Sequence, residues 1–165
     1  MRVSTVLATV AGANLASAGM MKIAANTVTW AWAVTDWNAG CLGDTQCHYD
    51  FNVTAEGDVN AKPPKPSFGA SCSGKGEGAD YTICEATRES EAPYVVVAKL
   101  LPRIENATGL MPPQIQVSLK YTDLNVATTW WNYTGKADAV YNEVGIDTTA
   151  ALSFTIHPDT IYGVA

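Results

Sequence analysis

The sequence predicts an all-β protein: a single-domain antiparallel β-barrel or sandwich of about eight strands, stapled by disulfides. Two segments, 48–53 and 115–121, alternate apolar and polar residues with the period of two that half-buried strands show. Only 16% of the residues are charged, and the chain is rich in Thr, Val, Tyr and Trp, which suit a pleated surface. No segment has a sustained helical period. Barrels and sandwiches both hide the edges of many short strands, so one of them is expected.

The first strands are expected at 29–37 and 48–53. In the first, large residues recur at even positions through Val34, which indicates one buried face. The second separates its side chains into two sets, with Tyr49, Phe51 and Val53 inside and His48, Asp50 and Asn52 outside.

A polar, proline-rich segment, 56–67, cannot donate a regular ladder of hydrogen bonds and is expected to be a long exposed loop. Short strands at 68–72 and 81–87 follow it. The flexible, glycine-rich segment 74–78 lies between them, so the two strands are expected to pair as a hairpin.

Two core strands are expected next. The segment 94–100 is a continuous apolar run with apolar residues on both faces, which favours the centre of a sheet. In 115–121 the alternation is unbroken, and four side chains are expected to point inward: Ile115, Val117, Leu119 and Tyr121.

The last strands are expected at 128–134 and 152–157. Gly135 and Lys136 either turn the first of these or bulge it before 137–141. Pro158 is expected to close the second, because proline has no amide proton for a ladder. The segment 161–164 is then expected to pack back onto the domain.

The N-terminus has the pattern of a secretory signal peptide. Arg2 is followed by an apolar stretch and then by small residues up to Ala18. We therefore expect residues 1–18 to be a leader and 19–165 to be a secreted, extracellular β domain. The apolar stretch is too short to cross a bilayer. The alternative is an alanine-rich N-terminal helix of a cytosolic protein.

Four cysteines lie in the first half of the expected domain, and an even count in an oxidising compartment is read as two disulfides. Three pairings are open. We favour Cys41 with Cys47 and Cys72 with Cys84, because each pair brackets a polar, glycine-containing segment. Such short loops stabilise a fold by about 2–3 kcal/mol. The cysteine spacing lacks a zinc pattern, so no metal site and no cofactor are expected.

Composition and motifs narrow the function. The net charge is −6, which disfavours binding to nucleic acid. The chain has no nucleophile elbow, zinc-protease motif or phosphate-binding loop, and no catalytic residue is expected. A glycosidase would need a carboxylate pair, which sequence cannot assign. Its candidates are Asp50, Glu56, Glu85, Glu89 and Asp138.

Three Asn-X-Thr triplets are candidate glycosylation sites in an exported eukaryotic protein. Asn106 is favoured because it lies in a segment typical of a loop. Asn52 and Asn132 lie within expected strands, where an attached glycan requires an outward-facing side chain.

Tryptophans offer a second kind of surface, either a sugar-stacking platform or a partner-binding patch. Adjacent residues of a strand point to opposite faces, so one of Trp130 and Trp131 is expected outside. Core packing is expected for Trp32 and Trp130. Trp131 is therefore the candidate partner-binding residue, together with the 56–67 loop.

Several motifs, spread over most of the expected mature chain, resemble one family. They are Trp32-x-Val34-x-Asp36-Trp37, Cys41 and Cys47 followed by Tyr49-x-Phe51-x-Val53, Cys72-x-Gly74 with Tyr81-x-x-Cys84, and Phe154-x-Ile156-x-Pro158 with Tyr162-Gly163. Together they resemble small secreted cysteine-containing proteins of filamentous fungi, the hypersensitive-response-inducing elicitors and the Alternaria-allergen-like β-barrel proteins. The chain lacks the later cysteines of the allergen branch.

The resemblance implies a secreted fungal effector or elicitor without catalytic activity, which is perceived by a host plant or acts on it. The expected partner is a host plant protein. The alternative is a cell-wall glycan, which the protein would bind or weakly hydrolyse. We expect no membrane span, and a monomer or a weak non-covalent dimer.

Overall fold

A computed structural model describes residues 21–23, 29–42, 46–106, 109–142 and 153–164. All regular structure among these residues is β-strand, as expected. The strands are, in chain order, β1 (Met21–Ile23), β2 (Trp32–Leu42), β3 (Gln46–Ala55), β4 (Phe68–Lys75), β5 (Thr82–Ile83), β6 (Glu85–Ala86), β7 (Tyr94–Leu101), β8 (Glu105–Asn106), β9 (Gly109–Leu110), β10 (Gln114–Thr122), β11 (Trp130–Asp138) and β12 (Phe154–Val164).

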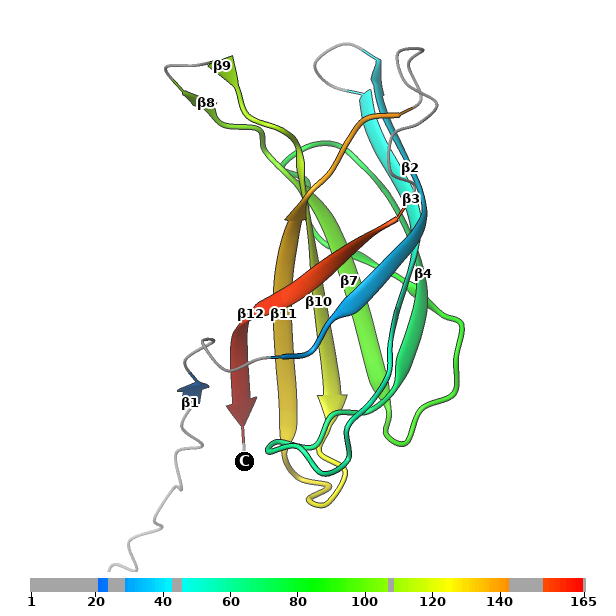
Figure 1. The fold of residues 1–165 in the computed structure, drawn as a ribbon, viewed down its shortest axis with the longest axis vertical. Coiled ribbons are helices and arrows are strands. Elements are labelled where there is room, and N and C mark those ends of the chain that lie inside the picture. The colour runs from blue at the N-terminus through cyan, green and yellow to red at the C-terminus, as the bar shows by residue number, and fades with distance from the viewer. Residues whose placement is uncertain (1–20, 24–28, 43–45, 107–108, 143–152, 165) are drawn as a thin grey trace, which may run out of the picture.

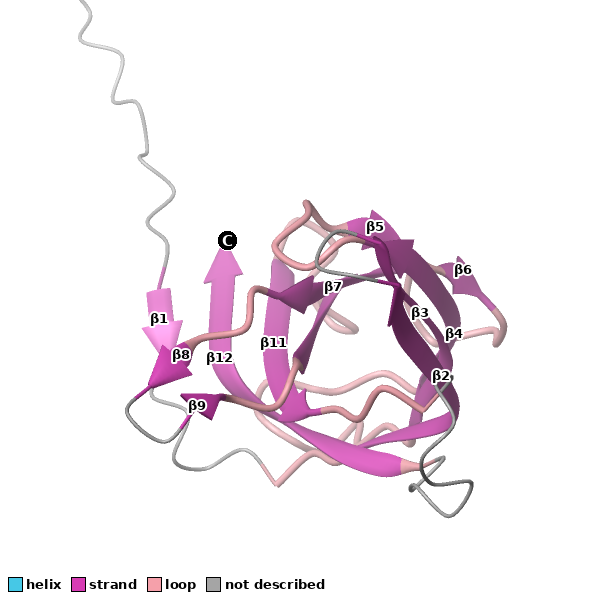
Figure 2. Ribbon diagram, turned by 90° about the horizontal axis from the view of Figure 1, so that it is seen from above, coloured by secondary structure: helices cyan, strands magenta, loops and turns pink. Residues whose placement is uncertain are grey.

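Nine of these strands form a nearly closed antiparallel barrel (Figures 1 and 2). The strand order is β5-β7-β10-β11-β12-β2-β3-β4-β6. Outside this path, β1 pairs with β12, and β8 with β9 makes a separate hairpin that projects beyond one end of the barrel (Figure 1). Of the two expected architectures, barrel and sandwich, the structure has the barrel.

The seam of the barrel lies at 82–86, the segment that the sequence assigned to a simple hairpin. Its first half, β5, pairs with β7, and its second half, β6, pairs with β4. Between them the Cys84 amide donates to the Val96 carbonyl at 2.9 Å, while its sulfur bonds Cys72 of β4. The expected hairpin is therefore only partly formed, because this segment divides its pairing between two neighbours.

Both expected disulfides are confirmed. Cys41 and Cys47 are cross-strand partners at the end of the β2–β3 pair. Cys72 and Cys84 join β4 to the seam segment. The first bond reinforces a local hairpin, whereas the second holds the barrel shut.

A bulge in β2 explains how its tryptophans are placed. Trp32 and Val34 point into the core at even positions, as expected, but the pairing with β3 shifts between Thr35 and Asn38. Asp36 there has φ 54°, in the left-handed region. The extra residue reverses the parity, so Trp37 is also buried, at 1% exposure.

The barrel interior is filled with aromatic and aliphatic side chains. The inward residues predicted for β3 and β10 are all buried. Trp30 centres an aromatic cluster with edge-on ring contacts to Trp32, Phe68, Tyr121 and Tyr133 at centroid distances of 5.3–6.5 Å. Its indole nitrogen donates to the Glu56 carbonyl, so the one polar group of this ring is satisfied.

Two strands differ from expectation. In β7, residues 96, 98 and 100 are buried, but Val95 on the other face is 48% exposed, so only one face is covered. β12 does not end at Pro158. It continues to Val164, because the pairing with β11 shifts at Thr134/Gly135 and sets the buried proline opposite Gly135. β11 therefore continues through Gly135 instead of turning there, and the extra residue at the register shift is Asp159 of β12.

The proline-rich segment 56–67 is more ordered than a simple exposed loop. Asp58 and Lys65 exchange two backbone hydrogen bonds, of 2.8 and 3.0 Å, that fold the segment back on itself. Tyr121 donates from its hydroxyl to the Pro64 carbonyl. The end of the segment, at Pro66 and Ser67, is buried.

The two disulfides should differ in their contribution to stability. Cys72→Ala with Cys84→Ala is expected to lower the free energy of unfolding by about 3 kcal/mol, and Cys41→Ala with Cys47→Ala by about 2 kcal/mol. The first bond closes the longer loop, with a sequence separation of 12 against 6, and also crosses the seam. Urea unfolding of both double variants measures this. An equal or larger loss in the Cys41 and Cys47 variant would contradict it.

Candidate functional site

Three loops meet at one end of the barrel, the lower end in Figure 1: 56–67, 87–93 and 123–129. Two contacts join the first two loops. Arg88 holds the Glu56 carboxylate with both guanidinium nitrogens, at 2.7 and 3.1 Å. The Ser67 amide donates to the Glu91 carboxylate at 2.9 Å. The loop 56–67 also reaches the barrel wall through its bond from Tyr121.

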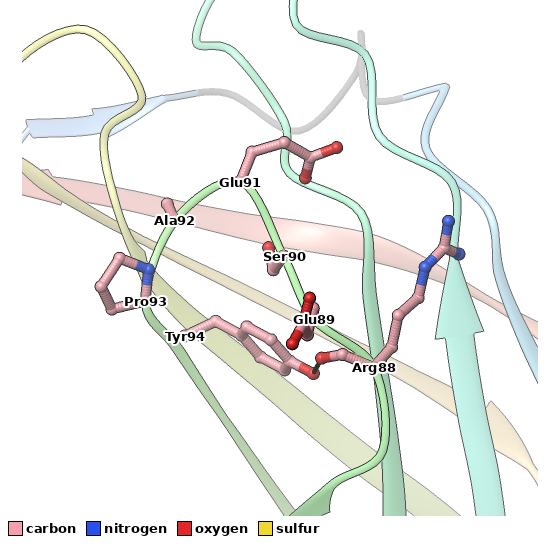
Figure 3. Close-up of a pocket in the computed structure, with 7 residues that line it drawn as sticks. All are labelled: Arg88, Glu89, Ser90, Glu91, Ala92, Pro93 and Tyr94. Carbon is pink, nitrogen blue, oxygen red and sulfur yellow. Dashed lines mark hydrogen bonds between the residues drawn. The ribbon is translucent and has the colours of Figure 1, made fainter.

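Tyr94, the first residue of β7, fixes the shape of the loop before it. Its hydroxyl lies 2.7 Å from the carbonyl oxygens of both Gly69 and Arg88, so its single proton is shared between β4 and the loop. Figure 3 shows the loop curled around this ring, with the Tyr94 hydroxyl directed at Arg88. The loop conformation is therefore set by a side chain of the barrel.

The curled loop encloses an open hollow of about 480 Å³, lined by residues 88–94 (Figure 3). We call it the loop hollow. Glu89 and Glu91 give it an acidic rim, and Glu89 is exposed. Within the described residues, the Ser90 hydroxyl oxygen is buried without a hydrogen-bond partner. The hollow thus presents carboxylates on a fixed backbone.

Hydrogen bonds lower the pKa of two carboxyl groups at this end of the barrel, those of Glu91 and Glu56. The pKa of Glu91 is lowered, first by its own backbone amide and then by the Ser67 amide. The pKa of Glu56 is lowered by the Arg88 guanidinium, through its hydrogen bonds and its charge. The Arg88 and Glu56 side chains are 41% and 81% exposed, so solvent screens this pair and it contributes little to stability.

A second, smaller hollow of about 230 Å³ adjoins the first, and Pro93 and Tyr94 line both. Its other walls include Val95, Lys120 and Trp130. The Lys120 ammonium lies 4.3 Å from the centre of the Trp130 ring. We call this the tryptophan hollow.

The structure reverses the expected roles of the two adjacent tryptophans. Trp131 pairs across the sheet with buried Tyr121 and Gly163, so it lies on the inner face and packs against the core. Its indole nitrogen donates to Asp123 at 2.7 Å. Trp130 is on the outer face. The prediction of Trp131 as the exposed residue was wrong, because the parity of this strand is set by its neighbours and not by its own sequence.

The candidate glycosylation sites are in three settings. Asn52 and Asn132 are both on outer faces, as an attached glycan would require. The Asn52 amide nitrogen donates to Asp36 at 2.9 Å. Asn106 ends β8 next to the undescribed residues 107–108, and its side chain is outside the described part of the chain. Residues 1–20 are also outside it, so the leader remains a prediction.

The acidic residues considered for a glycosidase pair lie in different places and contact different groups. Glu56 binds Arg88, and Asp138 accepts from the Gln114 amide at 2.7 Å. Glu89 lies on the loop hollow, and Asp50 and Glu85 are exposed on β3 and β6.

At the opposite, upper end of the barrel a second polar cluster surrounds Glu77. Its carboxylate lies 2.7 Å from the Arg103 guanidinium and accepts a hydrogen bond from Tyr141. Burial, and then the carboxylate itself, raise the pKa of Tyr141. Among the described residues, the one group with metal-ligand geometry is Glu77 with Cys41 and Cys47, and its two sulfurs are already joined in a disulfide.

No family model, curated protein or solved structure matches this chain. Within the described residues, none lies in a helix long and apolar enough to span a membrane. The two disulfides are compatible with an extracellular protein.

Sequence reasoning had selected the 56–67 loop as part of a binding surface, and the structure places it beside the loop hollow. It missed Tyr94 and the 87–93 loop, because their contacts are made with β4 and 56–67, far away along the chain. Pro93 directly precedes the apolar segment 94–100, and was the local signal that the chain changes direction before β7.

The hydrogen bond from the Ser67 amide to the Glu91 carboxylate predicts that the stability of the fold depends on pH. A carboxyl whose pKa is lowered by folding stabilises the fold above its ordinary value of 4.5, and loses this effect as the pH falls through the folded value. The wild type should therefore be more stable than Glu91→Gln at pH 7, and the difference should shrink at pH 3. Urea unfolding at the two pH values measures it; a difference that grows on acidification would contradict the assignment.

Proposed function

We propose that this chain is a secreted binding protein of the effector or elicitor type, which engages a host plant protein through the loop hollow. The observation that carries the proposal is the way in which the loop that lines the hollow is fixed by contacts with distant segments of the chain. Arg88, Ser67 and Tyr94 each join segments more than twenty residues apart. A surface ordered before binding loses little conformational entropy on contact, which favours recognition.

The charge of the hollow indicates the partner surface. Arg88 is already paired with Glu56, so the free charge at the rim is that of Glu89 and Glu91. The whole chain is acidic as well, with a net charge of −6. A partner with a basic patch would be attracted to this end and oriented by it.

The export route is part of the proposal. The N-terminal pattern of residues 1–18 and the two disulfides support it, because disulfides persist in oxidising compartments. The effector assignment adds the resemblance of the tryptophan, cysteine and C-terminal motifs to the fungal elicitors.

A cell-wall glycan is the second candidate partner, and Trp130 favours it. An outer-face indole beside a hollow, with a lysine ammonium at hand, offers both a stacking surface and a hydrogen-bond donor for sugar hydroxyls. A glycan array with the purified protein, followed by a turnover assay on any bound glycan, tests binding and weak hydrolysis. Absence of both would remove this candidate.

Infiltration of the purified protein into leaves of several plant species tests the effector proposal. The wild type is expected to cause necrosis or induce defence genes. Glu89→Lys should need a roughly tenfold higher dose, because it reverses the charge of the rim; a tenfold loss corresponds to about 1.4 kcal/mol of binding energy.

Asp80→Lys is the matched control. It makes the same change of charge on an exposed residue next to the segment that hydrogen-bonds Leu100, toward the far end of β7. It should leave the dose unchanged. A silent wild type in all hosts would remove the elicitor assignment, and equal doses for the two variants would remove the loop hollow as the binding surface.

A further inference from the structure

We propose that Asn132 carries an N-linked glycan in the exported protein, and that its first sugar packs on the outer-face side chain of Trp130. Trp130 and Asn132 are two residues apart on β11, so both side chains stand on the same outer face. The inference goes beyond the binding function and shares with it only the export route.

The amide of Asn132 is oriented for such a modification. The hydroxyls of Ser118 and Thr134 each lie 3.1 Å from its oxygen, Oδ1, and 2.8 Å from each other. No hydrogen bond in the described part of the chain uses its nitrogen, Nδ2. The oxygen is thus held by hydroxyls of β10 and β11, and the nitrogen, on the other side of the amide carbon, is directed away from them.

Attachment of a sugar preserves these contacts. Nδ2 forms a bond to C1 of the first N-acetylglucosamine of a lipid-diphosphate-linked oligosaccharide, and loses one proton. The bond from C1 to the diphosphate oxygen breaks, and the lipid diphosphate leaves with the electron pair. Oδ1 keeps its lone pairs throughout, so the hydrogen bonds from Ser118 and Thr134 remain available in the product.

Asn52 shows the opposite arrangement. Its Nδ2 already donates to the Asp36 carboxylate at 2.9 Å, so a sugar on this nitrogen would compete for space with a charged neighbour. Of the two triplets whose asparagine side chains are described, the one in β11 is therefore the better acceptor.

The surroundings of Asn132 suit a sugar ring. Its cross-strand partners on the outer face are Lys120 of β10 and Tyr162 of β12, at the spacing of about 5 Å that such partners have. Lys120 reaches over Trp130, and both line the tryptophan hollow of about 230 Å³. The indole supplies an apolar surface for the sugar ring, and the ammonium supplies a hydrogen-bond donor for its hydroxyls.

The acceptor claim is tested by glycopeptide mass spectrometry of the chain secreted by a yeast host. Asn132 is expected to be modified in the wild type and in Asn52→Gln. Thr134→Ser, which keeps the hydroxyl that the acceptor triplet requires, should retain the glycan, and Thr134→Val, of the same size as Thr, should lose it. Unmodified Asn132 in folded secreted protein would overturn the claim.

The platform claim is tested by spectroscopy. An endoglycosidase trims the glycan to its first N-acetylglucosamine, whose acetyl methyl proton should resonate upfield in wild type because of the indole ring current. Trp130→Leu should remove this shift. The single sugar should also raise the melting temperature over Asn132→Gln by about 3 °C in the wild type, and by much less in Trp130→Leu. A modified Asn132 with an unshifted methyl resonance would overturn the platform.

Failure of this inference is separable from failure of the proposed function. Cleavage after Ala18 in the secreted protein reports export, and the leaf assay reports binding. A variant whose residues 1–18 are replaced by the leader of the yeast host enters the secretory route in any case. If Asn132 remains unmodified in that variant, the glycan inference alone is overturned.

Discussion

Closure of the barrel at 82–86 is the constraint on which the rest of the structure depends. β4 and β7 run in the same direction, because each pair along the path between them is antiparallel, so the strand that joins them must run the other way. The chain supplies this strand with β5 and β6. Cys84 is the joint: its amide bonds β7 and its sulfur bonds β4. Without it, two strand edges would present unpaired backbone groups.

The loop hollow is a direct consequence of that closure. The 87–93 loop starts where β6 leaves β4 and ends where β7 begins, so it spans the seam at the lower end of the barrel. Tyr94 links the same two strands as Cys84, nearer the lower end of the barrel. It is the first residue of β7, and its hydroxyl donates to the Gly69 carbonyl of β4. The concave surface is therefore held by the same two strands that the seam joins.

The local sequence pattern was sufficient to predict the parts of the fold in which strands pair regularly. The alternation in β3 and β10 and the favoured cysteine pairs needed no distant information. Three of the wrong predictions concern strand registers that are set elsewhere. Asp36 adds a residue to β2. β12 continues past Pro158 with a shift of its register against β11, and Trp131 points inward because Tyr121 and Gly163 lie on either side of it. A shift of one residue exchanges the two faces of a strand, so these predictions depend on partners that the local sequence does not contain.

The two hollows are divided by Pro93 and Tyr94, and this division separates their chemistry. One side is a loop with carboxylates on a fixed backbone; the other is a strand surface with an indole and an ammonium. A glycan seated on Trp130 would cover the second hollow, which shares only Pro93 and Tyr94 with the first. Partner binding would then be confined to the acidic loop, where specificity rests on charge and shape rather than on exposed apolar area.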